Sequence, residues 1–130
     1  MAKRKVQEHG VSVAVKRIKN NLFIELSVTG KLTHEDYAAF IPVIEKALKS
    51  AKGLQVNLLV DMRDFKGWKE FRALVDDAKF GMKHLNDFDR IAAVGKRKWE
   101  EVALRAWGAL SKAEVRFFKR KEKALDWLLR

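Results

Sequence analysis

The chain has 130 residues, of which 48% are hydrophobic, and this size suits one compact domain built around one apolar core. It contains no cysteine, so disulfide bonds, thiolate metal sites and a cysteine nucleophile are excluded. The basic N-terminus leads into no apolar run of secretory length, and no stretch approaches the roughly 20 apolar residues that a bilayer-spanning helix needs. We therefore expect a soluble, cytoplasmic protein.

The charge balance is strongly basic. The formal net charge is +11, from 28 lysines and arginines against 17 aspartates and glutamates. A field of this sign attracts nucleic acid, anionic lipid or an acidic protein, but it does not choose among them. The basic residues form short clusters rather than one tail, at residues 3–5, 16–19, 96–98 and 119–121.

The first part of the chain predicts two antiparallel strands and a helix. Residues 11–17 and 22–28 are apolar or alternate with polar residues, and residues 19–21 between them favour a hairpin turn. Thr33 can then cap a helix. Its apolar side chains recur at helical spacing, at Tyr37, Phe40, Ile41, Ile44, Ala47 and Leu48. Pro42 lies inside this pattern, where we expect it to kink or interrupt the helix.

The rest of the chain alternates strands with helices. Three further strands are expected, at residues 55–61, 88–95 and 114–118. From Trp68 the pattern is helical, with one apolar stripe formed by Phe71, Leu74, Val75, Ala78, Met82 and Leu85. A third amphipathic helix is marked by its apolar residues Trp99, Val102, Ala103, Ala106, Trp107 and Leu110. Residues 119–130 form a last helix. That helix can pack against the sheet through Ala124, Leu125 and Leu128.

The predicted order of elements is ββαβαβαβα. Strands that alternate with helices imply right-handed crossovers and a parallel sheet, to which the N-terminal hairpin adds an antiparallel pair. No linker, repeat or low-complexity segment divides the chain. We therefore predict an α/β fold over residues 1–130 as a single domain, with a mixed, mostly parallel sheet and about four helices.

This order, together with five stretches of sequence, resembles the SpoIIAA-like family of the STAS superfamily. The stretches are Val28–Tyr37, Leu59–Trp68, Lys79–His84, Phe88–Gly95 and Lys98–Glu101. The resemblance covers nearly the whole chain. It implies a STAS-type fold that is sometimes compared with CRAL-TRIO lipid-binding domains, no established enzymatic activity, no cofactor and a small apolar ligand.

Two features differ from what the resemblance leads us to expect. STAS proteins that antagonise anti-sigma factors carry a phosphorylatable serine after the central strand. Residues 62–68 contain neither serine nor threonine, so this phosphoswitch is not expected here. In addition, residues 96–98 and 119–121 are basic where the family tends to be acidic or amide-bearing. The chain is therefore either a basic member of the family or one whose surface has been engineered.

The leading hypothesis is a non-enzymatic domain that binds a small apolar molecule or a protein partner. Ligands of open α/β sheets bind beyond the carboxyl ends of the strands, where the connections diverge, and this rule selects residues 61–68 and 95–99. Phe65, Trp68 and Trp99 could wall an apolar pocket there. The other candidate residues are Asp61, Phe71, Val75 and Lys96. The alternative is that the aromatic side chains only cap the core.

The runner-up hypothesis is a basic surface that binds nucleic acid or anionic lipid, because lysines and arginines set against phosphates release counterions. No recognition-helix, RNP-like or zinc-finger signature supports sequence-specific reading of nucleic acid. The terminal helix, with Trp127 and several lysines, could lie on a membrane surface. Docking of that helix on the sheet is the simpler interpretation.

Enzymatic chemistry comes third. His9, His34 and His84 are dispersed, no known catalytic motif is present, and no metal site is expected. A lysine desolvated in an apolar pocket can form Schiff bases, and Lys79 is the candidate for such an activity, natural or engineered. A homodimer could form through apolar helix faces.

Overall fold

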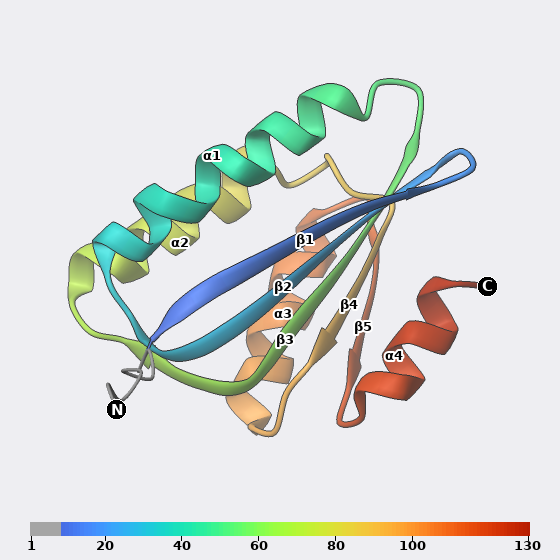
Figure 1. Cartoon of the computed structure of the whole chain (residues 1–130). Helices are drawn as coiled ribbons and strands as arrows, with labels where there is room; N and C mark the ends of the chain where they lie inside the picture. Colours follow the sequence, from blue (N-terminus) through green and yellow to red (C-terminus); the bar gives the residue numbers. More distant parts are fainter. Residues whose placement is uncertain (1–8) are drawn as a thin grey trace, which may run out of the picture.

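The computed structural model describes residues 9–130, where five strands lie side by side in chain order and four helices pack around them (Figure 1). The basic cluster at residues 3–5 lies outside the described residues. The strands are β1 (Gly10–Ile18), β2 (Asn21–Leu32), β3 (Gln55–Trp68), β4 (Arg90–Val94) and β5 (Glu114–Phe118). The helices are α1 (His34–Ser50), α2 (Phe71–Lys83), α3 (Lys98–Leu110) and α4 (Lys121–Leu128). This order confirms the predicted α/β fold.

The N-terminal hairpin is the antiparallel part of the sheet. β1 pairs with β2 so that Val13 lies opposite Leu26, and the chain reverses through Lys19, whose φ of 55° is of the left-handed kind that tight turns use. All other neighbours, β2 with β3, β3 with β4 and β4 with β5, are parallel. The predicted mixed sheet is therefore confirmed.

The three crossover helices share one face of the sheet. Each parallel connection advances one strand in the same direction, from β2 through to β5, and right-handed crossovers that advance in one direction must lie on the same side. Figure 1 shows α4 alone on the other side. The connections therefore do not diverge, and the expectation that a divergence point would mark the binding site is wrong for this fold.

The main core lies between the sheet and the crossover helices. α1 begins at a capping box, in which the Thr33 hydroxyl accepts from the Asp36 amide at 3.2 Å and the Asp36 carboxylate accepts from the Thr33 amide at 2.8 Å. Its side chains Tyr37, Phe40, Ile44 and Ala47 are buried. The helix continues as one element through Pro42, so the expected interruption does not occur, and the exposed proline ring lies on the solvent side.

Helix α2 packs in an unexpected orientation. Of its residues only Ala73 is fully buried, and Phe71, Leu74 and Met82 of the apolar stripe are among the exposed large hydrophobic side chains. An amphipathic helix normally turns such a stripe to the core. Here the stripe faces solvent, and the inward side carries small, polar and aromatic residues instead.

A second, smaller core lies beneath α4. It consists of the buried residues Leu59, Ala92, Val94, Ala124, Trp127 and Leu128. The guanidinium groups of Arg90 and Arg116 lie 5.3 and 5.5 Å from the Trp127 ring. Trp127 is thus enclosed between α4 and the sheet, and the terminal helix does not offer it to a membrane.

The second core predicts that two nearby residues of α4, Trp127 and Leu125, contribute very differently to the free energy of unfolding. We expect Trp127→Ala to lower the free energy of unfolding by about 3 to 5 kcal/mol, because the side chain is only 5% exposed and its removal leaves a cavity. Leu125→Ala, at a position 36% exposed, should cost about 1 kcal/mol. Urea denaturation of both variants measures the two costs, and equal values would show that α4 is not docked through Trp127.

Candidate functional site

The site begins with the unusual length of β3. The pairing of β3 with β4 ends at Asp61, but β3 continues to Trp68 alongside β2. Residues 61–68, expected as a loop, are therefore strand. β3 needs one extra residue between Asp61, opposite Ser27, and Asp64, opposite Thr29, which is a β-bulge. Strict alternation would place Phe65 on the same face as Asp61, and the bulge moves it to the side of the crossover helices.

Three of the candidate aromatic residues meet at the end of β3. The ring centroids lie 5.3 Å apart for Phe65 and Trp68, 6.2 Å for Phe65 and Trp99, and 5.9 Å for Trp68 and Trp99. These tilted and edge-to-face arrangements are the ones that aromatic pairs prefer. The sequence-based expectation that these side chains share one place is met by the geometry. Their role in binding stays a prediction.

A cleft of about 250 Å³ lies between α2 and α3, with β3 as its floor. We call it the Asp77 cleft. It is lined by Met62, Phe65, Trp68, Asp77, Gly81, Trp99, Glu100, Ala103, Leu104 and Trp107. The Trp107 indole donates to the Gly81 carbonyl at 3.0 Å, and a Cβ at Gly81 would lie 3.2 Å from the same nitrogen. Gly81 therefore allows the close contact between α2 and α3.

A second cavity of about 200 Å³ adjoins the cleft, and we call it the inner cavity. It is lined by Val11, Leu26, Val28, Leu32, Tyr37, Phe40, Leu58, Val60, Met62, Phe65, Asp77 and Phe80. Three residues, Met62, Phe65 and Asp77, line both spaces. Asp77 is the only charged residue that the described cavities share at this boundary.

Asp77 belongs to a chain of hydrogen bonds that joins β3, α1 and α2. The Trp68 indole donates to the Tyr37 hydroxyl at 2.8 Å, and that hydroxyl donates to the Asp77 carboxylate at 2.6 Å. One turn earlier in α1, the His34 ring contacts Asp76 at 2.5 Å. These contacts hold the inward side of α2 by polar groups, where an ordinary amphipathic helix would use apolar ones.

The protein around Asp77 changes its acidity. Water reaches Asp77 through the cleft, but the side chains crowded around the carboxyl oppose its ionisation. This desolvation raises the pKa of Asp77, against the smaller opposite influence of Tyr37 and Trp68. Burial, followed by the charge of Asp77, also raises the pKa of the Tyr37 hydroxyl far above its usual range. The pair therefore keeps its protons to a higher pH than isolated groups would.

A second carboxylate fixes the wall of the cleft. Glu100 is buried, and one of its oxygens accepts from the backbone amides of Lys96 at 3.2 Å and Arg97 at 3.1 Å, which caps the start of α3. Its other oxygen has no hydrogen-bond partner, although the Arg97 guanidinium lies 3.6 Å away. Arg97 also donates to the Phe65 carbonyl, which ties α3 to β3. Glu100 and Arg97 thus hold Trp99 against Phe65.

The other candidate residues lie away from the cleft. Asp61 is on the α4 side of the sheet, where it pairs with Arg63 at 2.9 and 2.7 Å, and this contact lowers the pKa of Asp61. Phe71 and Val75 are on the outer side of α2, and the Lys96 side chain is exposed. None of these four residues lines the cleft, so the fold does not bring them together with Phe65, Trp68 and Trp99.

Sequence reasoning missed Asp77, Tyr37 and Trp107 as site residues. Tyr37 and Trp107 were assigned to apolar helix stripes, which describes their burial but not their hydrogen bonds. One signal was available for Asp77. Four-residue spacing places it between Ala73 and Gly81 on one side of α2, and two small residues beside a carboxylate leave space around it.

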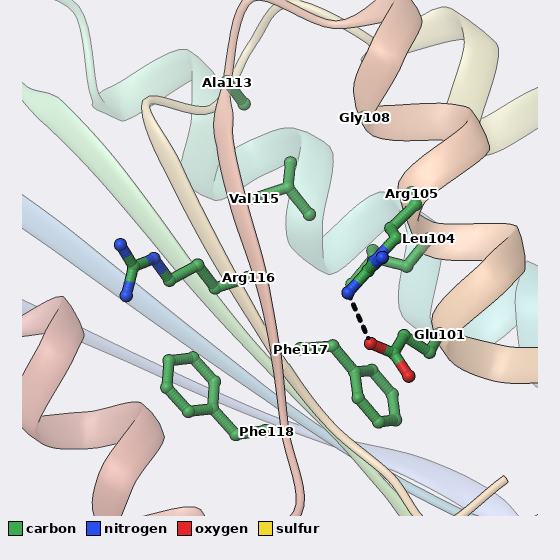
Figure 2. A pocket seen from close by; sticks show the side chains of 9 residues that line it. All are labelled: Glu101, Leu104, Arg105, Gly108, Ala113, Val115, Arg116, Phe117 and Phe118. Carbon is green, nitrogen blue, oxygen red and sulfur yellow. Dashed lines mark hydrogen bonds and ion pairs between the residues drawn. The ribbon is translucent and has the colours of Figure 1, made fainter. Parts of the chain in front are cut away.

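Larger hollows exist but are less suited to an apolar ligand. One of about 430 Å³ borders β5 and α3, and Figure 2 shows that it straddles the edge strand, with Phe117 on one side and Arg116 and Phe118 on the other. Arg105 and Glu101, both on α3, form an ion pair of 2.8 Å on its helix side. Another, of about 640 Å³, is a surface hollow lined by His9, Gly30 and three lysines. Neither surrounds a ligand with apolar walls.

Within residues 9–130, no three histidine, aspartate or glutamate side chains converge as a metal site would require. His84 instead contacts Glu45 at 2.8 Å and Asp87 at 2.6 Å. That contact ties the end of α2 to α1.

Comparison with known proteins places the fold. A family model described as SpoIIAA-like matches residues 23–129. Among solved structures, the chain is similar to the crystal structure of an uncharacterized protein of the DUF3478 family, with a SpoIIAA-like fold, from Shewanella loihica PV-4. The two share 32% sequence identity and a TM-score of 0.78 over 97% of this chain and 99% of that chain. No curated protein matches the chain.

The raised pKa of Asp77 predicts that Asp77→Asn increases folding stability, by an amount that depends on pH. A carboxyl whose pKa is raised on folding binds its proton more tightly in the folded state, so folding stability falls as pH rises from the ordinary pKa of 3.8 through the folded one. Asparagine removes this loss and still accepts from Tyr37. We expect Asp77→Asn to match the parent near pH 3 and to be more stable at pH 7.

Urea denaturation across this pH range measures the difference between variant and parent. Asp76→Asn is the control, because it loses the contact with His34 and should gain no stability at pH 7. A difference between Asp77→Asn and the parent that stays constant with pH would contradict the assignment.

Proposed function

The chain belongs to the SpoIIAA-like family, and from this premise we propose that it binds a small apolar molecule carrying one hydroxyl group in the Asp77 cleft. One observation carries the proposal. Asp77, whose carboxyl group has a raised pKa, lies at the boundary between two mostly apolar spaces, and the other carboxylate of the cleft, Glu100, already accepts from two backbone amides. Ligand sites of this kind use apolar walls for affinity and a few polar groups for orientation.

The volume of the cleft sets the size of the ligand. An apolar cavity of roughly 150 Å³ binds benzene, and the Asp77 cleft measures about 250 Å³. A bicyclic aromatic molecule or a short branched chain is therefore of suitable size. The aromatic rings of Phe65, Trp68 and Trp99 favour a flat ligand that can stack or meet them edge to face.

The protonation of Asp77 selects the polar group of the ligand. When protonated, the carboxyl donates one hydrogen bond, and when ionised it only accepts. Its raised pKa makes the protonated form more common than for an ordinary aspartate. An alcohol or phenol both donates and accepts, so it matches Asp77 in either state, whereas a carboxylate ligand would be repelled by the ionised form.

The residues around the cleft favour binding rather than catalysis. Among the residues that line the Asp77 cleft there is no lysine, histidine, serine or threonine. Lys79, the candidate for Schiff-base chemistry, is exposed on α2, so the apolar surroundings that would activate it are missing. The absence of serine and threonine from residues 62–68 also argues against a phosphoswitch.

A titration with two matched ligands tests the proposal. We expect 1-naphthol to bind and to quench or shift the fluorescence of the tryptophans in the cleft wall. Naphthalene, which lacks the hydroxyl, should bind about fivefold more weakly, the worth of one modest hydrogen bond. Asp77→Leu should remove this preference without removing the apolar contacts.

Two substitutions on α3 provide the matched control. Ala103 lines the cleft and Ala106 does not, although both are exposed residues of the same helix. Ala103→Trp should fill the cleft and abolish 1-naphthol binding, whereas Ala106→Trp should leave it within about twofold of the parent. Equal binding by the two variants, or no binding by the parent, would disprove the proposed site.

A further inference from the structure

The outer side of α2 is apolar and uncovered. Phe71 is 77% exposed and Met82 is 55% exposed, although aromatic and thioether side chains of this size are usually buried. At 100° per residue these two positions lie directly opposite Phe80, which packs against the main core. The exposure is therefore a consistent property of one helix face and not an isolated side chain.

Helix α3 extends this face across the mouth of the Asp77 cleft. Trp99, Val102 and Leu110 are also exposed. α2 and α3 are joined across the cleft by the hydrogen bond from Trp107 to Gly81. We define the outer apolar face as Phe71, Leu74, Met82, Trp99, Val102 and Leu110. These are six of the eleven exposed large hydrophobic side chains in the described residues, so such residues are concentrated at the opening of the cleft.

The borders of this face are basic. The exposed charged residues of α2 and α3 are Arg72, Asp77, Lys79, Lys83, Lys98 and Arg105, and Asp77 is the only acid among them. The helical positions of Arg72, Lys79 and Lys83 follow the border nearest α1. Arg105, which borders β5, lies on the opposite border. Lys83 pairs with Glu45, and Lys98 and Arg105 both pair with Glu101, so the uncompensated positive charge lies mainly at Arg72 and Lys79, on the border nearest α1.

We propose that the outer apolar face docks on the surface of an anionic lipid bilayer. Such a surface offers negative headgroups to the basic borders and an apolar layer to Phe71, Met82 and Trp99. A second copy of the chain suits the face less well, because two-fold pairing would bring the basic borders of two molecules, each with a net charge of +11, against one another.

The docked protein lies on the bilayer and does not cross it. No helix in residues 9–130 is long and apolar enough to span a membrane. Because the Asp77 cleft opens at the outer apolar face, docking places its mouth against the lipid, and an apolar ligand can enter without passing through water. This entry route rests on the proposed function, whereas docking itself depends only on the surface.

Vesicle co-sedimentation tests the docking. We expect the full chain to bind phosphatidylcholine vesicles that contain phosphatidylserine, to bind pure phosphatidylcholine vesicles weakly, and to lose binding as salt is raised. Met82→Glu should weaken binding to the anionic vesicles about tenfold. Leu129→Glu is the matched control: it makes the same charge change at a residue 60% exposed, against 55% for Met82, outside the outer apolar face, and should retain most of the binding.

Three outcomes would overturn the proposal. The first is absence of binding to anionic vesicles at low salt. The second is an equal loss in Met82→Glu and Leu129→Glu, which would indicate attraction by net charge alone. The third is a dimer that Met82→Glu dissociates while the parent ignores vesicles, which would assign the face to a second copy. Binding to duplex DNA that outlasts vesicle binding as salt rises would likewise assign the basic borders to nucleic acid.

The same variant separates this proposal from the proposed function. Met82 does not line the Asp77 cleft, so Met82→Glu should still bind 1-naphthol in solution. Lost vesicle binding with normal 1-naphthol binding supports docking through this face. Normal vesicle binding by a parent protein that does not bind 1-naphthol would retain the docking surface and reject the ligand site.

Discussion

The handedness of the crossovers governs the rest of this structure. Three right-handed connections that advance in one direction across the sheet must place α1, α2 and α3 on a single face. α2 lies between the other two and buries only Ala73 completely. Because its neighbours contact it through hydrogen bonds from Tyr37 and Trp107, the space beneath it is not filled by its own side chains. The cleft follows from this incomplete packing.

Asp77 gives the site its polar group at a cost to the fold. An apolar side chain at this position would fill part of both cavities and avoid the desolvation that raises the pKa of the carboxyl. Residues that are suboptimal for stability concentrate at functional sites, where local rules are broken for a reason. The solvent-facing apolar stripe of α2 is a second feature that is unfavourable for stability, and it lies next to the Asp77 cleft.

The sequence was sufficient for the fold and for part of the site. Alternation and aliphatic runs located the strands, and the spacing of aromatic residues around β3 and α3 brought Phe65, Trp68 and Trp99 together in the prediction. Amphipathic spacing shows which residues share a helix face, but it cannot show which face packs against the sheet. For α2, the assumption that the apolar stripe packs inward was wrong. Asp77 was therefore missed as a site residue, and Phe71 and Val75 were placed near the site although they lie on the outer side of the helix.

Because of the bulge in β3, the site depends on the number of residues in this segment as well as on their side chains. Side chains of a strand point alternately to its two sides, so the side that Phe65 occupies is decided by whether the number of residues before it is odd or even. Loss of Arg63, which lines neither cavity, would change no cavity-lining residue, yet it would transfer Phe65 to the α4 side. This short segment therefore tolerates substitution more readily than a change of length.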